Sequence, residues 1–212
     1  FISDRADLLC AVFMLACAIL YLKFISVNKI SIDFLIALTY ILAILSKENS
    51  IILPPLLVSY HFIFRNKPSG IRLAVLLCIA LIYVALRLTV LMPSSSPEIS
   101  FNIMLQRIPG FIAALGDYLR IILLPFDLHI EYSYRLFGPL ELKTVLAAAA
   151  AFLLLAYAFL KRKSDKFMSF GVAWFFIMLF PVSNIYPIAD SYMAERWLYF
   201  PAIGIIFILA RY

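Results

Sequence analysis

Residues 73–92 read LAVLLCIALIYVALRLTVLM, and Arg87 is the only charged residue in this stretch. An α-helix rises about 1.5 Å per residue, so a helix of this length spans the roughly 30 Å of hydrocarbon in a bilayer. Two further blocks, residues 6–22 and 144–160, are nearly as long and contain a single charged residue between them, Asp7. The sequence therefore predicts a polytopic membrane protein built of α-helices.

Composition supports the same class. Hydrophobic residues make up 65% of the chain and charged residues 14%, with a mean hydropathy of +1.02, whereas soluble domains contain about 25% charged residues. The net charge of +6 arises from Lys and Arg in short loops between apolar blocks, a pattern that sets membrane orientation. The lipid bilayer is therefore the expected partner, and nucleic acid is not.

The apolar blocks predict an all-α bundle of about seven transmembrane helices in a single domain covering residues 1–212, with an interfacial helix in the connection 93–140. Because the chain starts at Phe1 without Met or a leader pattern, we expect a fragment of a longer protein. The predicted spans are 6–23, 31–46, 50–64, 73–92, 141–160, 167–183 and 197–212.

The basic loops predict the orientation of these spans. Seven alternating crossings place the loops 24–30, 65–72 and 161–166 on one side, and the positive-inside rule identifies this side as cytoplasmic. The other side collects most of the carboxylates. We therefore expect any polar site on the external face, in the periplasm of a bacterial inner membrane or the lumen of the endoplasmic reticulum.

The connection 93–140 contains an apolar stretch, residues 103–124, that Arg107, Asp117 and Arg120 interrupt. If this stretch crossed the bilayer, the basic loop 161–166 would move to the external side. An amphipathic helix in the outer interface is therefore the favoured interpretation, and a further crossing is the alternative.

Three short charged clusters fall at predicted external helix ends. The first contains Asp4, Arg5 and Asp7, for which helix capping is the ordinary explanation. The second is the pair Lys47 and Glu48, and a polar turn would account for it. The third is Glu195 and Arg196, followed by Trp197 and Tyr199, residues typical of an interfacial aromatic belt. The clusters are as follows: Ser3-Asp4-Arg5-Ala6-Asp7, Ser46-Lys47-Glu48-Asn49 and Ala194-Glu195-Arg196-Trp197-Leu198-Tyr199.

Two other features have both structural and functional interpretations. Arg87 is close enough to the outer end of its helix to extend into the interface, or it binds a phosphate or carboxylate there, because a guanidinium grips oxyanions with two parallel donors. Asp127, His129 and Glu131 alternate after Pro125. They form either a metal or sugar contact or an exposed polar loop.

The charged clusters occur in an order that resembles a known enzyme family. In sequence order the shared motifs are Arg5-Ala6-Asp7-Leu8-Leu9, Ser46-Lys47-Glu48 followed by apolar residues and Pro54, Leu124-Pro125, Phe180-Pro181-Val182-Ser183-Asn184 and Ala194-Glu195-Arg196-Trp197-Leu198-Tyr199-Phe200-Pro201-Ala202-Ile203-Gly204. This set resembles the membrane half of the transmembrane and tetratricopeptide-repeat-containing O-mannosyltransferases and their bacterial relatives, which are GT-C glycosyltransferases.

The resemblance implies transfer of a sugar from a polyprenyl-phosphate carrier to a protein or glycan acceptor on the external side, usually with inversion. In that family an acidic catalytic motif lies upstream of the Arg-Ala-Asp helix and helical repeats follow the membrane part, so both would lie outside residues 1–212. The catalytic base is unassigned; the available carboxylates are Asp7, Glu48 and Glu195. The candidates for substrate binding are Arg5, Lys47, Arg87, Arg196 and Tyr199.

Other functions are open. Arg87 and a helix broken at Pro54 and Pro55 would suit a transporter or flippase for a lipid-linked or anionic substrate, and a noncatalytic lipid-binding subunit is a third class. Neither His61 nor His129 has a Cys or second His at metal-ligand spacing, so no metal site is assigned. No cofactor is indicated, and use of a divalent metal ion is an open alternative.

Overall fold

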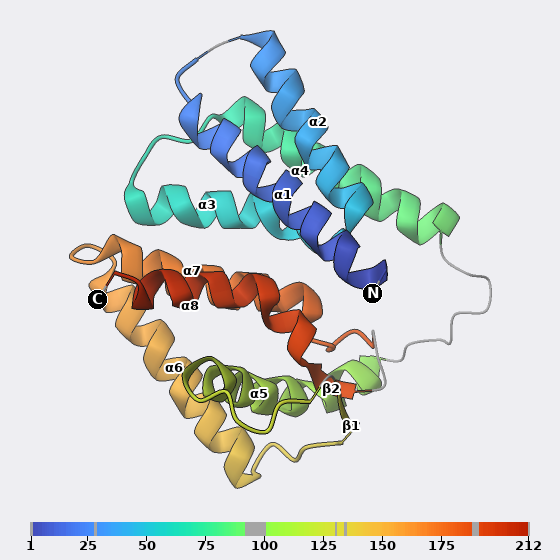
Figure 1. Cartoon of the computed structure of the whole chain (residues 1–212), viewed down its shortest axis with the longest axis vertical. Coiled ribbons are helices and arrows are strands. Elements are labelled where there is room, and N and C mark those ends of the chain that lie inside the picture. The colour runs from blue at the N-terminus through green and yellow to red at the C-terminus, as the bar shows by residue number, and fades with distance from the viewer. Residues whose placement is uncertain are drawn as a thin grey trace. The chain divides into compact units, whose positions relative to one another are not determined.

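The computed structural model describes residues 2–27, 29–91, 101–129, 131–133, 135–187 and 191–211. Within these ranges the side chains of residues 2–4, 91 and 131 lie outside the description, so the predicted roles of Asp4 and Glu131 do too. The chain divides into two compact units, unit 1 (Phe1–Ser96) and unit 2 (Pro97–Tyr212). Both are mainly helical (Figure 1).

The helices follow the predicted apolar blocks, and each of the seven segments forms helix. Unit 1 contains α1 (Ile2–Lys23), α2 (Ile30–Ser46), the 3-10 helix η1 (Glu48–Ile52), α3 (Leu53–Phe64), α4 (Gly70–Leu86) and the π-helical turn η2 (Arg87–Leu91). Unit 2 contains α5 (Phe101–Leu123), β1 (Glu131–Ser133), α6 (Leu142–Lys161), α7 (Lys166–Leu179), η3 (Phe180–Val182), β2 (Ser191–Ala194), η4 (Glu195–Leu198) and α8 (Tyr199–Leu209).

Helix length separates the spans into two groups. Among the described residues three helices are long and apolar enough to cross a membrane, Arg5–Lys23, Gly70–Val90 and Leu142–Lys161. Of the remaining predicted spans, α3 has 12 residues and rises only about 18 Å, less than the roughly 30 Å of hydrocarbon. The structure thus supports a membrane protein with three candidate spans.

The boundaries of α2 and α3 have local causes. Lys47 adopts an extended conformation, which ends α2, and η1 then turns the chain. Pro54 and Pro55 lie in the first turn of α3, where proline costs no hydrogen bond because the first amides of a helix have no partner within it. At the other end Arg65 is left-handed, with φ 58°. The two prolines therefore begin a helix and do not interrupt one.

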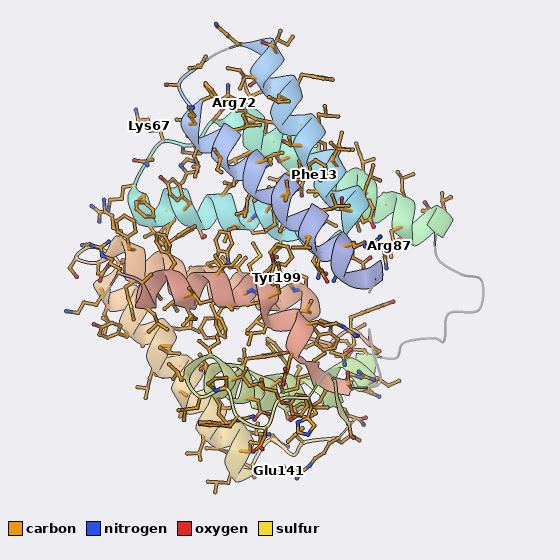
Figure 2. All side chains as sticks on the ribbon, in the orientation of Figure 1. Phe13, Lys67, Arg72, Arg87, Glu141 and Tyr199 are labelled. Atoms are coloured by element: carbon orange, nitrogen blue, oxygen red, sulfur yellow. The ribbon has the colours of Figure 1, made fainter. Side chains whose placement is uncertain are left out.

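Arg72 connects the helix ends on one side of unit 1. Its side chain is buried and donates hydrogen bonds to Asp33 at 2.6 Å and to the carbonyls of Phe24 and Val27 at 2.5 Å. The start of α4 is therefore attached to the loop between α1 and α2. Arg72 and Arg87 lie at opposite ends of α4 (Figure 2).

Small residues allow the helices of unit 2 to pack closely. At the α7–α8 crossing, a Cβ on Gly171 would lie 2.6 Å from the carbonyl oxygen of Gly204. The indole of Trp174 donates to the carbonyl of Phe200 at 2.8 Å on the same pair of helices. Close backbone approach at glycine is a common mode of helix association in membranes.

The two strands of unit 2 were not part of the all-α prediction. β1 and β2 pair antiparallel, with Tyr132 opposite Met193 (Figure 1). The hydroxyl of Tyr118 on α5 donates to the carbonyl of Ala194 at 3.2 Å, which attaches the strands to the core. The sheet has only three and four residues per strand, too few for alternation to identify reliably from sequence.

The crossing of α7 and α8 predicts the effect of a small substitution. Gly204→Ala places a methyl group against the backbone carbonyl of Gly171, so we expect the free energy of unfolding to fall by about 1 to 3 kcal/mol, as for other overpacked sites. Gly70→Ala is the matched control because a Cβ there has nothing within 4 Å. Thermal unfolding in detergent measures both, and equal midpoints would contradict the close crossing.

Candidate functional site

Four of the predicted site residues meet at one end of unit 1. Asp7 comes from α1, Lys47 and Glu48 from the turn after α2, and Arg87 from the end of α4. Lys47 forms an ion pair with Asp7, and Arg87 forms one with Glu48. We call these four residues the unit 1 charge cluster. Segments up to 80 residues apart in sequence (Asp7 to Arg87) thus contribute to one polar surface.

The turn that carries Lys47 and Glu48 is held by its backbone. The amide of Lys47 donates to the carbonyl of Ala43 at 3.0 Å, as the last bond of α2. Its carbonyl accepts from the hydroxyl of Ser50 at 3.0 Å and contacts the thiol of Cys10 at 3.8 Å. Since Ser50 and Cys10 are both buried, the backbone between two charged side chains is fixed against α1.

The two ion pairs differ in exposure. The side chains of Lys47 and Asp7 are 25% and 13% exposed, whereas those of Arg87 and Glu48 are 49% and 40% exposed. Water screens the outer pair, and exposed pairs contribute only about 0–1 kcal/mol to stability. Arg87 and Glu48 can therefore exchange partners at small cost. Arg5 is also exposed, on the first turns of α1.

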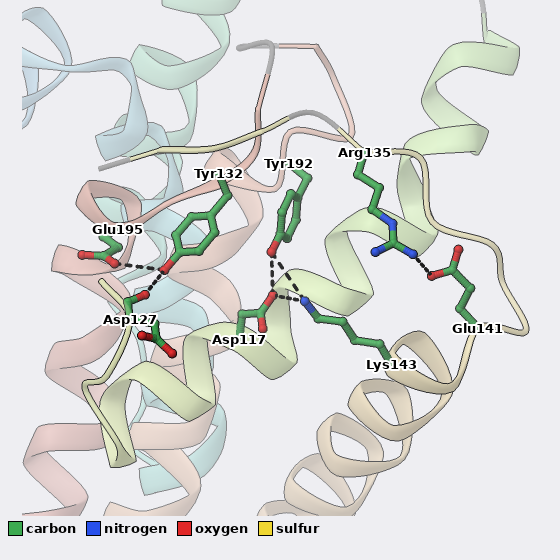
Figure 3. Close-up of polar contacts among 8 residues, drawn as sticks. All are labelled: Asp117, Asp127, Tyr132, Arg135, Glu141, Lys143, Tyr192 and Glu195. Carbon is green, nitrogen blue, oxygen red and sulfur yellow. Dashed lines mark hydrogen bonds and ion pairs between the residues drawn. The ribbon is translucent and has the colours of Figure 1, made fainter. Parts of the chain in front are cut away.

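In unit 2 Glu195 joins a network of hydrogen bonds (Figure 3). Its carboxylate accepts from the backbone amide of His129 at 2.6 Å and from the hydroxyl of Tyr132 at 3.1 Å. The carbonyl of Asp127 lies equally close to that hydroxyl, at 3.1 Å. Because a phenol has one proton, Tyr132 donates to one of these two acceptors at a time.

A second part of the network centres on Asp117, which is 9% exposed on the inner face of α5. Its Oδ2 accepts from the hydroxyl of Tyr192 at 2.9 Å and pairs with the Nζ of Lys143 at 2.7 Å (Figure 3). The Lys143 ammonium also lies 5.4 Å from the ring centroids of Phe137 and Tyr192. The ammonium of Lys143 thereby neutralises the buried carboxylate of Asp117.

Both tyrosine hydroxyls of the network hold their protons firmly. Burial and then the negative charge of Asp117 raise the pKa of Tyr192. Burial and then the hydrogen bond to Glu195 raise the pKa of Tyr132. The phenols are therefore hydrogen-bond donors to the two carboxylates at neutral pH and do not act as bases.

Two further predicted site residues lie at the surface of unit 2. Arg196 is exposed, and Tyr199 is 48% exposed. Asp127 has a left-handed backbone, with φ 53°, so the alternation predicted for Asp127, His129 and Glu131 is broken before β1 begins. Across the part of the chain that the structure describes, no three His, Cys, Asp or Glu side chains lie close enough to hold a metal ion.

Sequence reasoning missed Asp117, Lys143 and Tyr192 as a connected group. One signal was present: Asp117 occurs at helical spacing on the buried face of α5, seven residues after Gly110 and four before Ile121. A carboxylate in such an apolar stripe needs a partner. The partners come from α6 and β2, and local sequence does not reveal which distant residues will supply them.

No protein-family model, curated protein or solved structure matches this chain.

The network predicts a specific stability effect. Tyr192→Phe removes a hydroxyl that donates to the buried Asp117, and we expect a loss of about 1.5 to 3 kcal/mol, as for other hydrogen bonds to charged groups. Tyr186→Phe, an exposed tyrosine of the same unit, should change the free energy of unfolding by less than about 0.5 kcal/mol. Equal losses in chemical denaturation would show that the Tyr192 bond is dispensable.

Proposed function

We propose that this chain is the membrane part of a GT-C glycosyltransferase that transfers a sugar from a polyprenyl-phosphate carrier to a protein or glycan acceptor. The observation that carries the proposal is the unit 1 charge cluster. Asp7, Lys47 and Glu48 belong to the motifs of the family resemblance, and they lie together with Arg87 at one helix end. Motif residues that are far apart in sequence thus converge in space.

The cluster offers two cations for the donor phosphate and two carboxylates for the acceptor hydroxyl. A polyprenyl-phosphate donor presents an anion at the membrane boundary while its isoprenoid chain lies against apolar helix faces. Arg87 and Lys47 can exchange their carboxylate partners for the phosphate oxygens, which favour charge-assisted bonds to guanidinium and ammonium groups. The positive charge then stabilises the leaving phosphate as negative charge develops on it.

The same exchange releases a carboxylate for proton transfer. When Arg87 turns to the phosphate, Glu48 is able to accept the proton of the acceptor hydroxyl, and Asp7 has the same option when Lys47 moves. The acceptor oxygen forms the new bond to the anomeric carbon, and the bond from that carbon to the phosphate oxygen breaks. The products are the glycosylated acceptor and the polyprenyl phosphate.

The membrane arrangement belongs to the same proposal. We place about seven crossings in a bacterial inner membrane or the endoplasmic reticulum, with α5 in the outer interface and the unit 1 charge cluster facing the periplasm or lumen. Two observations support this arrangement: Arg72 and Arg87 lie at opposite ends of α4 (Figure 2), and α5 contains the charged residues Arg107, Asp117 and Arg120.

A transporter has less support from the structure. The helix break on which that alternative relied is the start of α3, where Pro54 and Pro55 occupy the first turn. Arg87 pairs with Glu48 near a helix end, whereas ionisable residues of transporters concentrate near the bilayer midplane. A noncatalytic lipid-binding subunit would use the same anion contacts without transfer.

Cysteine labelling tests the orientation. In a background with Cys10, Cys17 and Cys78 replaced by serine or alanine, a cysteine at Ser164 should react only after the cells are permeabilised, because the basic loop 161–166 that contains it is expected in the cytoplasm. A cysteine at Gly138, in the external connection, is the positive control and should react in intact cells. Labelling at position 164 in intact cells would refute the proposed topology.

Activity of the full-length protein tests the unit 1 charge cluster. Arg87→Ala should lower sugar transfer from a polyprenyl-phosphate donor on the order of tenfold if about 1.4 kcal/mol of transition-state contact is lost. Its effect on stability should stay within about 1 kcal/mol because the ion pair is half exposed.

Lys161→Ala is the matched control, since Lys161 is exposed at the end of α6, on the expected cytoplasmic side. It should leave transfer unchanged. Equal activities of the two variants at equal amounts of folded protein would exclude Arg87 from donor binding.

A further inference from the structure

Four basic residues without a role in the proposed transfer gather at one end of unit 2. Arg162 and Lys163 lie in the loop between α6 and α7, and Lys166 begins α7. Arg211 follows α8, which ends at the same end of unit 2 (Figure 1). The guanidinium of Arg211 lies 4.2 Å from the ring centroid of Phe167, near the start of α7. We call the four basic residues the basic end of unit 2.

The basic end of unit 2 carries a net positive charge. Asp165 is the only acidic residue in α7, α8 and the loop 162–165, so one carboxylate stands against four basic side chains. Its Oδ1 accepts from the backbone amide of Met168 at 3.0 Å and caps the start of α7. Lys163 and Arg211 are both exposed, so this surface attracts an anionic partner.

Hydrogen bonds fix the loop that carries these charges. The backbone amides of Ser164 and Asp165 donate to the carbonyl of Lys161 at 3.0 Å and 2.7 Å, which closes the chain into a tight turn. The hydroxyl of Ser169 on α7 is buried and lies 2.7 Å from the carbonyl of Ala158 on α6. The start of α7 is thereby attached to the end of α6, and the cations are held close together before any ligand binds.

Exposed apolar side chains lie beside the cations. Phe159 on α6 is 57% exposed, and the guanidinium of Arg162 lies 3.7 Å from the centroid of its ring. Phe207 on α8 is half exposed, and its ring centroid lies 6.0 Å from that of Phe167. Basic side chains that cover apolar surface while their charged ends reach water are typical of the boundary between hydrocarbon and lipid head groups.

The position of the basic end in the chain indicates its partner. The candidate span Leu142–Lys161 ends one residue before Arg162, so these charges lie where α6 would leave the hydrocarbon. Clusters of Lys and Arg directly beside a transmembrane helix bind anionic lipids. A soluble acidic partner would match the charge, but the exposed rings of Phe159 and Phe207 match the acyl chains of a phospholipid.

We propose that the basic end of unit 2 binds the head groups of anionic phospholipids. Lys163 and Arg211 contact the phosphate oxygens, and the neighbouring phenylalanines contact the acyl chains. The proposal requires α6 to cross the membrane. It does not depend on the proposed glycosyl transfer or on any residue of unit 1.

Fluorescence quenching in nanodiscs tests this surface in the full-length protein. The native cysteines are replaced by alanine, and Ser164→Cys carries a bimane fluorophore within the basic end. The nanodiscs contain phosphatidylcholine and a minor share of spin-labelled phosphatidylglycerol or, in the reference, spin-labelled phosphatidylcholine. The nitroxide lies near the head group in both lipids. We expect stronger quenching by phosphatidylglycerol at the same mole fraction, and high salt should reduce the difference.

Two matched double variants assign the lipid preference to the basic end. Lys163→Gln with Arg211→Gln should reduce the preference for phosphatidylglycerol severalfold, because each basic residue near an anionic surface contributes about fivefold to lipid affinity. Arg65→Gln with Lys67→Gln removes one exposed Arg and one exposed Lys from unit 1 and should leave the preference unchanged. Thermal midpoints identify the folded variants, and Lys163→Gln alone is the smaller change if the double variant unfolds.

Three results would overturn the proposal: equal quenching by the two lipids in the parent, an unchanged preference in the folded Gln variants of the basic end, or an equal loss in the unit 1 variant. Binding of an acidic peptide without enrichment of phosphatidylglycerol would assign the surface to a protein partner instead. Intact lipid preference in a protein that shows no sugar transfer would count against the proposed function alone.

Discussion

The fold within each unit depends on the free-energy cost of placing a charged group beside apolar helices. A charged group that leaves water needs an opposite charge or several hydrogen bonds nearby. Asp7 meets this need through Lys47, and Asp117 meets it through Lys143. Each pair joins segments that are distant in sequence, so the requirement for neutralisation also fixes which helix ends lie together.

The helices were predictable because their signal is local. Stretches such as residues 73–92 are apolar over the length of a bilayer crossing, and the helix α4 with its π-helical turn follows that stretch. The meeting of Asp7, Lys47 and Glu48 was also predictable, since alternating helix directions place those helix ends on one side. Neither inference required knowledge of a specific long-range contact.

Other features depend on contacts between distant segments, and sequence alone does not supply these. The pairing of Tyr132 with Met193 joins strands about 60 residues apart (132 to 193), and each strand is too short to show a period. Asp117 occupies a core position of α5 that an apolar residue would ordinarily fill, and its partners Lys143 and Tyr192 lie on other elements. The ion pair and the hydrogen bond of Asp117 therefore stabilise a charged residue at a position where the helical pattern predicts an apolar one.

Charge balance sets how a phosphate can enter the unit 1 charge cluster. Each cation there faces its own carboxylate, so a phosphate that replaces the partner of Arg87 or Lys47 leaves that carboxylate free. In the proposed transfer, the free carboxylate is the base that accepts the proton of the acceptor hydroxyl. Loss of Arg87 is therefore expected to lower the rate of that transfer.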